Sequence, residues 1–219
     1  EEQAYKWISD GVEGFEITEA ERDKFGTDIK LYLKDDAKDY VDTIYLRHII
    51  RTYSDHINYP IVLNLGKAGE ETVNTGSALW TQNKAEITDE QYQEFYQHIS
   101  HNFDQAAAWT HFKVEGRQEY SGLLYIPTRP PFDLYERDPK HGVKLYVKRV
   151  FIMDDAKKLM PLYLRFVRGV IDSGDLPLNV SREILQQSKD LDAIRQGSVK
   201  KVLALLEDLQ KNQPEKYAE

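Results

Sequence analysis

Two segments in the second half of the chain, residues 112–126 and 143–152, alternate apolar and polar side chains, and this constrains the fold more than any other feature. A period of two residues is that of a half-buried β-strand, so the two segments are predicted to form paired strands. The loop between them, residues 127–142, is rich in proline and charge. Residues 163–171 are ambiguous by period, but their β-branched content favours a further strand.

Helices are predicted before and after these strands in the sequence. Thr88 and Gln91 have the spacing of a capping box, so a helix should begin near residue 87 and run to about Phe103. Residues 154–160 predict a short helix that Pro161 stops. From Ser181 onward the chain should be helical, because an apolar stripe follows at helical spacing, formed by Val199, Val202, Leu203, Leu206 and Leu209. The second part of the chain is therefore predicted to be a mixed α/β layer with helices on a sheet.

The first part of the chain predicts shorter elements. Residues 5–8 and 14–17 read as strands beside glycine turns, and residues 29–33 alternate like another strand. Residues 39–57 predict an amphipathic helix, and residues 60–65 a short strand.

A polar segment separates the two parts. Residues 67–77 are rich in glycine, threonine and glutamate and have almost no apolar side chains, which is typical of a linker. We therefore place a first domain at residues 1–66, a linker at 67–78 and a second domain at 79–219.

The composition excludes several classes of partner and site. The chain has 29 basic and 37 acidic residues, a net charge of -8, which disfavours nucleic acid and anionic membranes as main partners. No apolar run approaches the roughly 20 residues that span a bilayer, and the first residues do not resemble a signal peptide. The absence of cysteine excludes disulfides and thiolate metal sites and fits a reducing compartment, so we expect a cytoplasmic protein.

The segment Leu176–Gln187 carries the strongest chemical signal. Pro177 interrupts the chain and Ser181 is a good N-cap, so the segment should turn from loop to helix. Arg182 and Gln186 are four residues apart and therefore share one helix face. A planar guanidinium beside an amide suits a phosphate. On local sequence alone, a solvated helix start is the competing interpretation.

This segment, together with Tyr146–Asp155 and Phe166–Ser173, closely resembles the ninety-kilodalton heat-shock chaperone family. Further blocks match in the same order, namely residues 26–29, 53–57, 79–82, 114–120 and 130–134. The resemblance implies that the first domain is the incomplete end of an N-terminal nucleotide-binding domain, its last strands and final helix. It implies that the second domain is the large subdomain of the middle domain, with a layered α/β fold resembling the ribosomal protein S5 domain 2-like fold.

The same resemblance implies a function. The intact protein is expected to be an ATP-dependent chaperone that uses Mg²⁺ and binds unfolded or partly folded client proteins, with co-chaperones as further partners. It should be a homodimer through a C-terminal domain. That domain, the ATP lid, the helix with the general-base glutamate and the small middle subdomain have no counterpart in this sequence. We therefore expect a fragment that by itself holds no cofactor and hydrolyses no ATP.

The resemblance also assigns roles to five residues. Arg182 corresponds to an arginine finger that reaches the γ-phosphate from the middle domain, and Gln186 to its partner in the catalytic loop. Thr27 corresponds to a threonine that helps hold adenine, although here it could be an ordinary strand hydroxyl. Phe151 would support the catalytic loop as well as pack in a strand. Trp80 is either an exposed contact for client proteins or an anchor at the end of the linker.

Other interpretations are weaker. Glu94, His98 and His101 have a spacing that a metal could use, but a solvated helix face is favoured and no metal site is expected. A DNA-topology or mismatch-repair ATPase also places an α/β domain after its nucleotide domain. Such enzymes typically present a lysine rather than the Arg182 and Gln186 pair, and the net charge does not suit DNA. A non-enzymatic interaction module stays open as the second alternative.

Overall fold

The computed structural model describes residues 3–100, 103–116, 118–131, 134–135, 142–154, 159–177 and 189–218. The chain divides into two units, Glu1–Asp39 and Tyr40–Glu219, and each is described on its own. No helix in the described ranges is long and apolar enough to cross a membrane.

The first unit contains one antiparallel hairpin. Strand β1 (Ala4–Ile8) pairs with β2 (Glu16–Ala20). The two predicted strands are thus confirmed, the second one shifted toward the C-terminus. Gly11 and Gly14 in the connecting turn have φ of 82° and 127°, which a residue with a Cβ rarely adopts. The strand predicted at residues 29–33 is wrong, because these residues form no strand and their side chains are exposed. Alternation specifies a strand only where a neighbouring strand and a core are available.

The second unit begins with a helix and a small hairpin. Helix α1 (Thr43–Tyr53) follows a 3-10 helix, Asp35–Val41, and starts where the side chain of Asp42 accepts a 2.8 Å hydrogen bond from the backbone N–H of Tyr45. Strand β3 (Val62–Asn64) pairs antiparallel with β4 (Glu70–Thr72). The predicted helix and short strand are thus confirmed with narrower bounds.

The segment 67–77, whose composition predicted a linker, contains regular structure. It contains a short 3-10 helix, Gly66–Ala68, and strand β4. Just after β4, Asn74 is buried and its amide donates hydrogen bonds to the carbonyl oxygens of Ile57 (2.9 Å) and Tyr59 (3.0 Å). The polar residues therefore hydrogen-bond to backbone rather than solvate a flexible tether. The domain limits drawn around this segment remain predictions.

A five-stranded mixed sheet forms the centre of the second unit. Its order is β5-β6-β9-β7-β8, and only β7 and β9 run parallel. The strands are β5 (Ala106–Val114), β6 (Tyr120–Pro127), β7 (Gly142–Val147), β8 (Val150–Met153) and β9 (Arg168–Ser173).

Three details of this sheet correct the sequence prediction. Residues 112–126 include the end of β5 and most of β6, and residues 143–152 include most of β7 and part of β8. The two predicted segments do not pair with each other, because β9 lies between β6 and β7. Strand β9 begins only at Arg168, since Leu162–Leu164 form a 3-10 helix.

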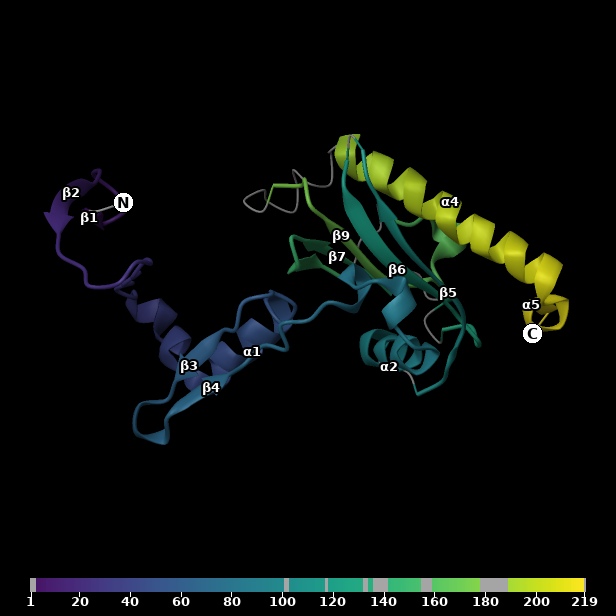
Figure 1. Cartoon of the computed structure of the whole chain (residues 1–219), viewed down its shortest axis with the longest axis horizontal. Coiled ribbons are helices and arrows are strands. Elements are labelled where there is room, and N and C mark those ends of the chain that lie inside the picture. Colours follow the sequence, from purple (N-terminus) through teal and green to yellow (C-terminus); the bar gives the residue numbers. More distant parts are fainter. Residues whose placement is uncertain are drawn as a thin grey trace. The chain divides into compact units, whose positions relative to one another are not determined.

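Two helices cover opposite faces of the sheet (Figure 1). Helix α4 (Lys189–Asn212) packs on the face to which Leu124 of β6 belongs, and helix α2 (Asp89–Ser100) packs on the face of the next residue, Tyr125. Successive residues of a strand point to opposite faces of the sheet. Apolar side chains at successive positions of β6 are therefore buried on both faces. The predicted mixed α/β layer is confirmed, and its likeness to the S5 domain 2-like fold remains a prediction.

The helix ends agree with the sequence where the structure describes them. The backbone N–H of Thr88 donates to Gln91 Oε1 (2.9 Å), and the N–H of Gln91 donates to Thr88 Oγ1 (3.3 Å), which confirms the capping box. In α4, Val199, Val202, Leu206 and Leu209 are buried or half-buried as the apolar stripe predicted, whereas Leu203 is exposed. Helix α5 (Pro214–Ala218) follows. Residues 155–158, the middle of the helix predicted at 154–160, and the helix start predicted at Ser181 lie outside the described residues.

Gly169 in β9 is expected to tolerate no side chain. Its φ is 142°, and a Cβ there would lie 2.2 Å from the carbonyl oxygen of Leu123 in the neighbouring strand. Gly169→Ala should therefore lower the free energy of unfolding by about 1–3 kcal/mol, measured by urea denaturation. Gly174→Ala is the matched control, because the nearest atom to its Cβ would be 3.7 Å away. Equal midpoints for the two variants would contradict this prediction.

Candidate functional site at the carboxyl edge of the sheet

The parallel strands β7 and β9 end at the same edge, where Val147 is paired with Ser173. The segment that carries Arg182 leaves the sheet there, and its first residues are held firmly. The hydroxyl oxygen of Ser173 accepts hydrogen bonds from the backbone N–H groups of Asp175 (3.3 Å) and Leu176 (3.2 Å), and Leu176 is buried. Loops at the carboxyl ends of parallel strands commonly carry the functional residues of α/β sheets.

Arg182 and Gln186 lie outside the described residues. Their assignment to a phosphate therefore stays a prediction from the sequence. The structure describes the residues on both sides of their segment, namely Leu176, three residues after the end of β9, and α4 from Lys189 onward.

A buried carboxylate organises the same edge. Asp172 of β9 is 7% exposed; its Oδ2 accepts a hydrogen bond from Trp80 Nε1 (2.9 Å) and its Oδ1 one from the backbone N–H of Arg149 (3.1 Å). Burial raises the pKa of Asp172, and these two hydrogen bonds act against that rise. The carboxylate thus joins three parts of the chain that are distant in sequence.

The two-residue turn between β7 and β8 presents two cations at this edge. Lys148 and Arg149 have φ of 49° and 66°, a left-handed conformation that costs free energy in residues other than glycine. The backbone N–H of Lys148 donates to the carbonyl oxygen of Ser173 (2.9 Å), and that of Arg149 donates to Asp172, so both neighbours in β9 stabilise the turn. Both residues line a pocket of about 320 Å³ together with Tyr59.

Trp80, in the 3-10 helix Leu79–Thr81, is an anchor of the fold. Its side chain is 1% exposed, its indole N–H reaches Asp172, and its ring lies 4.9 Å from that of Tyr146 and 4.7 Å from that of His56. Its carbonyl oxygen accepts a 3.0 Å hydrogen bond from His111 Nε2. Of the two interpretations of Trp80, the buried anchor fits this geometry, and an exposed client contact does not.

Phe151 of β8 is half-buried. Its ring contacts those of Tyr146 (5.7 Å between centroids) and Tyr53 (5.8 Å), the last residue of α1. It therefore packs between the sheet and the helix predicted to close the nucleotide-binding domain. Its role as a support of the catalytic loop remains a prediction, because that loop lies outside the described residues.

Thr27 lies in the first unit, is exposed, and belongs to no strand. The strand expected around it is wrong, for the same reason as at residues 29–33. Its contact with adenine stays a prediction from the resemblance.

Glu94 and His98 both lie on α2, whereas His101 is outside the described residues. Among the described residues, no group of three or more histidine, cysteine, aspartate or glutamate side chains could hold a metal ion.

Asp172, His56 and Arg149 were not predicted from the sequence as residues of this edge of the sheet. For Asp172 a signal existed, because an acid inside the apolar run of β9 must find partners when the strand is buried. For His56 and Arg149 there was none, since their contacts are with residues distant in the sequence.

Two histidines beside Trp80 predict how stability depends on pH. Burial lowers the pKa of both His56 and His111. The unfolded chain takes up protons as the pH falls through about 6.5 while the folded chain does not, so the free energy of unfolding should fall with the pH below that value. In urea titrations, the free energy of unfolding of His111→Gln should differ less between pH 7.5 and pH 6.0 than that of the original protein. Asp172, whose raised pKa acts in the opposite direction, is present in both proteins. If the free energies of unfolding at the two pH values differ by the same amount in His111→Gln as in the original protein, His111 does not cause the pH dependence.

Comparison with known proteins gives a consistent family. The family model described as Hsp90 protein matches residues 67–219. The Chaperone protein HtpG of Chromobacterium violaceum is 58% identical over 230 residues, which cover 100% of this chain and 36% of that protein. The proteins of the same name from Bordetella avium and Dechloromonas aromatica are 54% and 56% identical, over 99% of this chain in each case and over 36% and 35% of their own lengths. The chain thus spans about a third of the length of these relatives.

Proposed function

Because the chain belongs to the Hsp90 family, we propose that it is part of an ATP-dependent molecular chaperone that binds unfolded or partly folded client proteins. The observation that carries this proposal is the identity of more than half of all positions with relatives named Chaperone protein HtpG, along essentially the whole chain. Identity of this extent supports the same family, so the function named for the relatives is the best hypothesis for this protein.

The contribution of this chain would be a side chain presented to a nucleotide that is held elsewhere. Thr27 is the one adenine contact predicted from the sequence, and its side chain is exposed. Mg²⁺ and ATP would be bound by the complete N-terminal domain and would supply the phosphoryl group that is hydrolysed. Arg182 would place positive charge near that group, and Gln186 would add a neutral hydrogen-bonding group.

The geometry of the carboxyl edge supports this role. An arginine finger needs a rigid base, since its effect depends on where the charge stands when the bond breaks. Here the segment begins at Leu176, a buried residue whose backbone is hydrogen-bonded to Ser173. The neighbouring β7–β8 turn is fixed to β9 as well.

The two alternative functions have less support. The match to the Hsp90 family does not favour a DNA-topology or mismatch-repair ATPase, and the net charge of -8 does not suit DNA. An interaction module without catalysis differs from the proposal only in whether Arg182 acts on the nucleotide. We further propose that the intact protein is a cytoplasmic homodimer that works with co-chaperones.

A holding assay with the full-length protein tests the proposal. Guanidine-denatured malate dehydrogenase is diluted into buffer with and without the protein, and light scattering reports its aggregation. The protein should suppress aggregation at a few-fold molar excess, and Mg²⁺ with ATP should change the extent of suppression. Scattering that matches an equal mass of serum albumin, with or without ATP, would contradict the proposed function.

A further inference from the structure

The two-residue turn between β7 and β8 has an unusual sequence for its geometry. Val147 and Val150 pair across it, and both residues between them have a positive φ. Hairpin turns of this geometry strongly prefer Asn-Gly or Asp-Gly, since these residues enter the left-handed region at little cost. Lys148 and Arg149 occupy the turn instead. Strained backbone of this kind is found most often at ligand-binding and catalytic positions, so the two side chains are candidates for a function.

The fold uses the backbone of this turn and leaves its side chains available. The backbone N–H groups of Lys148 and Arg149 donate to neighbouring residues of β9. Among the described residues, none forms a hydrogen bond or an ion pair with the ammonium group of Lys148 or the guanidinium group of Arg149. Asn-Gly would keep both backbone bonds, so the fold alone does not explain the two cations.

Both cations line the pocket of about 320 Å³ at the carboxyl edge of the sheet. A polar row across three strands forms part of the same lining, because Lys113 of β5 is paired with Ser121 of β6, and Ser121 with Asp172 of β9. Residues directly opposite each other on neighbouring strands project from the same face. A third cation and a hydroxyl group therefore lie on the same side of the sheet beside the turn.

Two carboxylates among the described lining residues are engaged within the fold. Asp172 accepts hydrogen bonds through both of its oxygen atoms. Glu119 is exposed and stabilises the charge of Lys113, whose ammonium group also forms a 2.6 Å ion pair with Glu115. Among the described charged groups of the lining, the two cations of the turn are thus those available to a ligand.

We propose that this pocket binds inorganic phosphate between Lys148 and Arg149. A guanidinium group offers two parallel donors to a tetrahedral oxyanion, an ammonium group adds a point charge, and the hydroxyl of Ser121 is a further donor. Lys148 is exposed and Arg149 is only partly buried. The affinity should therefore be modest, with a Kd of about 1–10 mM.

The proposal rests on the proposed ATP-dependent function and deepens it. Hydrolysis of ATP by water gives ADP, inorganic phosphate and a proton. The pocket adjoins the start of the segment predicted to carry the arginine finger, because Gly174, which follows β9, is one of its lining residues. It would therefore hold the phosphate after release from the nucleotide, and excess phosphate would hinder that release.

Phosphate binding to the 219-residue chain is measured by NMR of the backbone amides. Sodium phosphate at neutral pH replaces sodium chloride at constant ionic strength. The amide signals of Ser121, Lys148 and Arg149 should shift in a saturable manner, whereas chloride alone should leave them in place. Mg²⁺-ATP at the same concentration should not shift them, because Mg²⁺ occupies its phosphate oxygens. Shifts with Mg²⁺-ATP or chloride equal to those with phosphate would overturn the proposal.

The double variant Lys148→Asn, Arg149→Gly, called the turn variant, separates the ligand from the fold. It should weaken phosphate binding about tenfold or more, because both cations are removed. It should also raise the midpoint of urea denaturation, since Asn-Gly suits the positive φ values. A lower midpoint would show that the two side chains stabilise the turn itself, and equal phosphate binding would show that they hold no anion. Either result would overturn the proposal.

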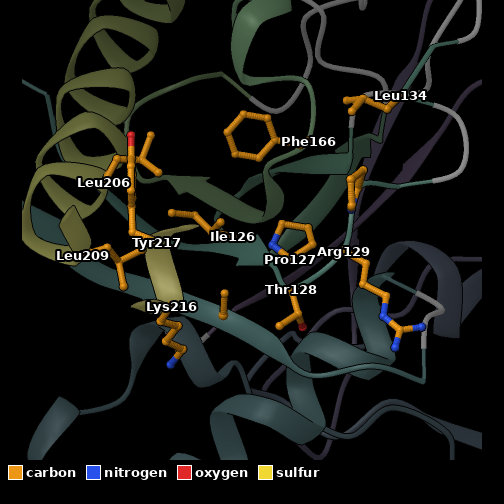
Figure 2. A pocket seen from close by; sticks show the side chains of 12 residues that line it. Ile126, Pro127, Thr128, Arg129, Leu134, Phe166, Leu206, Leu209, Lys216 and Tyr217 are labelled. Atoms are coloured by element: carbon orange, nitrogen blue, oxygen red, sulfur yellow. The ribbon is translucent and has the colours of Figure 1, made fainter. Parts of the chain in front are cut away.

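A second pocket supplies a matched control. Its volume is about 250 Å³, it lies beside the end of α4, and Arg129 and Lys216 are among its lining residues. In Figure 2 the charged ends of both point away from the apolar side chains of Phe166 and Leu206. The control variant Arg129→Gln, Lys216→Gln makes the same change in net charge as the turn variant. It should leave the affinity for phosphate within about twofold. An equal loss in both variants would reduce the effect to general electrostatics and overturn the proposal.

Turnover by the full-length protein tests the link to hydrolysis. Added phosphate at constant ionic strength should slow steady-state ATP turnover, and the turn variant should need about tenfold more phosphate for the same slowing. Equal sensitivity of the two proteins would contradict the proposed site. Failure of phosphate binding while the full-length protein still suppresses aggregation would overturn the phosphate site and leave the proposed function standing. A failed holding assay would remove that function, whatever the pocket binds.

Discussion

Replacing Arg182 by alanine in the full-length protein is expected to lower steady-state ATP turnover about tenfold or more while leaving the affinity for ATP unchanged. The arginine would come from a different domain than the one that binds ATP, so it should act after the domains dock and chiefly on the transition state. Arginine fingers supplied in trans contribute about 10³–10⁵ in rate, and an ATPase limited by docking should lose less. Turnover at saturating ATP is the measurement.

Two further variants make the test specific. Arg182→Lys should restore only part of the rate, because lysine keeps the charge but loses the planar fork of donors. Gln186→Ala should be milder than Arg182→Ala, since it removes a neutral group. Lys200→Glu on α4 is the control for a general loss of structure or charge, and it should turn over ATP at the original rate. If Arg182→Ala turns over ATP at the rate of the original protein, Arg182 is only a surface charge.

Trp80→Ala is expected to lower the free energy of unfolding of the second unit by about 3–5 kcal/mol. The indole ring is fully buried among aromatic rings, and its removal would leave a cavity beside β7 and β9. It would also take away the N–H group that donates to Asp172, whose carboxylate would then be buried with one partner fewer. Urea denaturation followed by circular dichroism measures the change.

Two variants separate packing from hydrogen bonding at this position. Trp80→Phe keeps an aromatic ring but not the donor, so it should cost less than Trp80→Ala. Trp7→Ala, in the first unit, removes an indole that is 63% exposed and should leave the unfolding of the second unit unchanged. A Trp80→Ala protein with nearly unchanged stability but weaker client capture would instead revive the client-contact interpretation.

The elements that could be predicted from the sequence are those whose causes are local. The capping box at Thr88 and Gln91 needs only four consecutive residues, and the apolar stripe of α4 repeats within one helix. The pairing of β3 with β4 shows the limit of this approach. Its second strand lies in a segment whose composition is that of a linker, and it forms because backbone groups find partners there.

The order of the sheet depends on distant contacts, and periodicity contains no information about them. Strand β9 inserts between β6 and β7, so the two alternating segments that seemed to pair are separated by a strand that follows both in the chain. Residues 29–33 show the opposite case. The alternating pattern is present there, but the residues pair with no neighbouring strand and form none themselves.

The candidate site divides in the same way. Arg182 could be proposed from a continuous motif, whereas the bond between Trp80 and Asp172 joins residues 92 positions apart. Local sequence left Trp80 undecided between anchor and contact surface, because an indole ring suits both. Only its burial, and the acceptor that its N–H finds in β9, separate the two.

The most direct test of the central claim, that this chain acts on a nucleotide bound outside it, is a calorimetric titration with ATP and Mg²⁺. We expect saturable binding to the full-length protein and no measurable heat of binding to the 219-residue chain at the same concentrations. Saturable micromolar binding to the chain alone would show that its own residues form a nucleotide site, and that result would contradict the account.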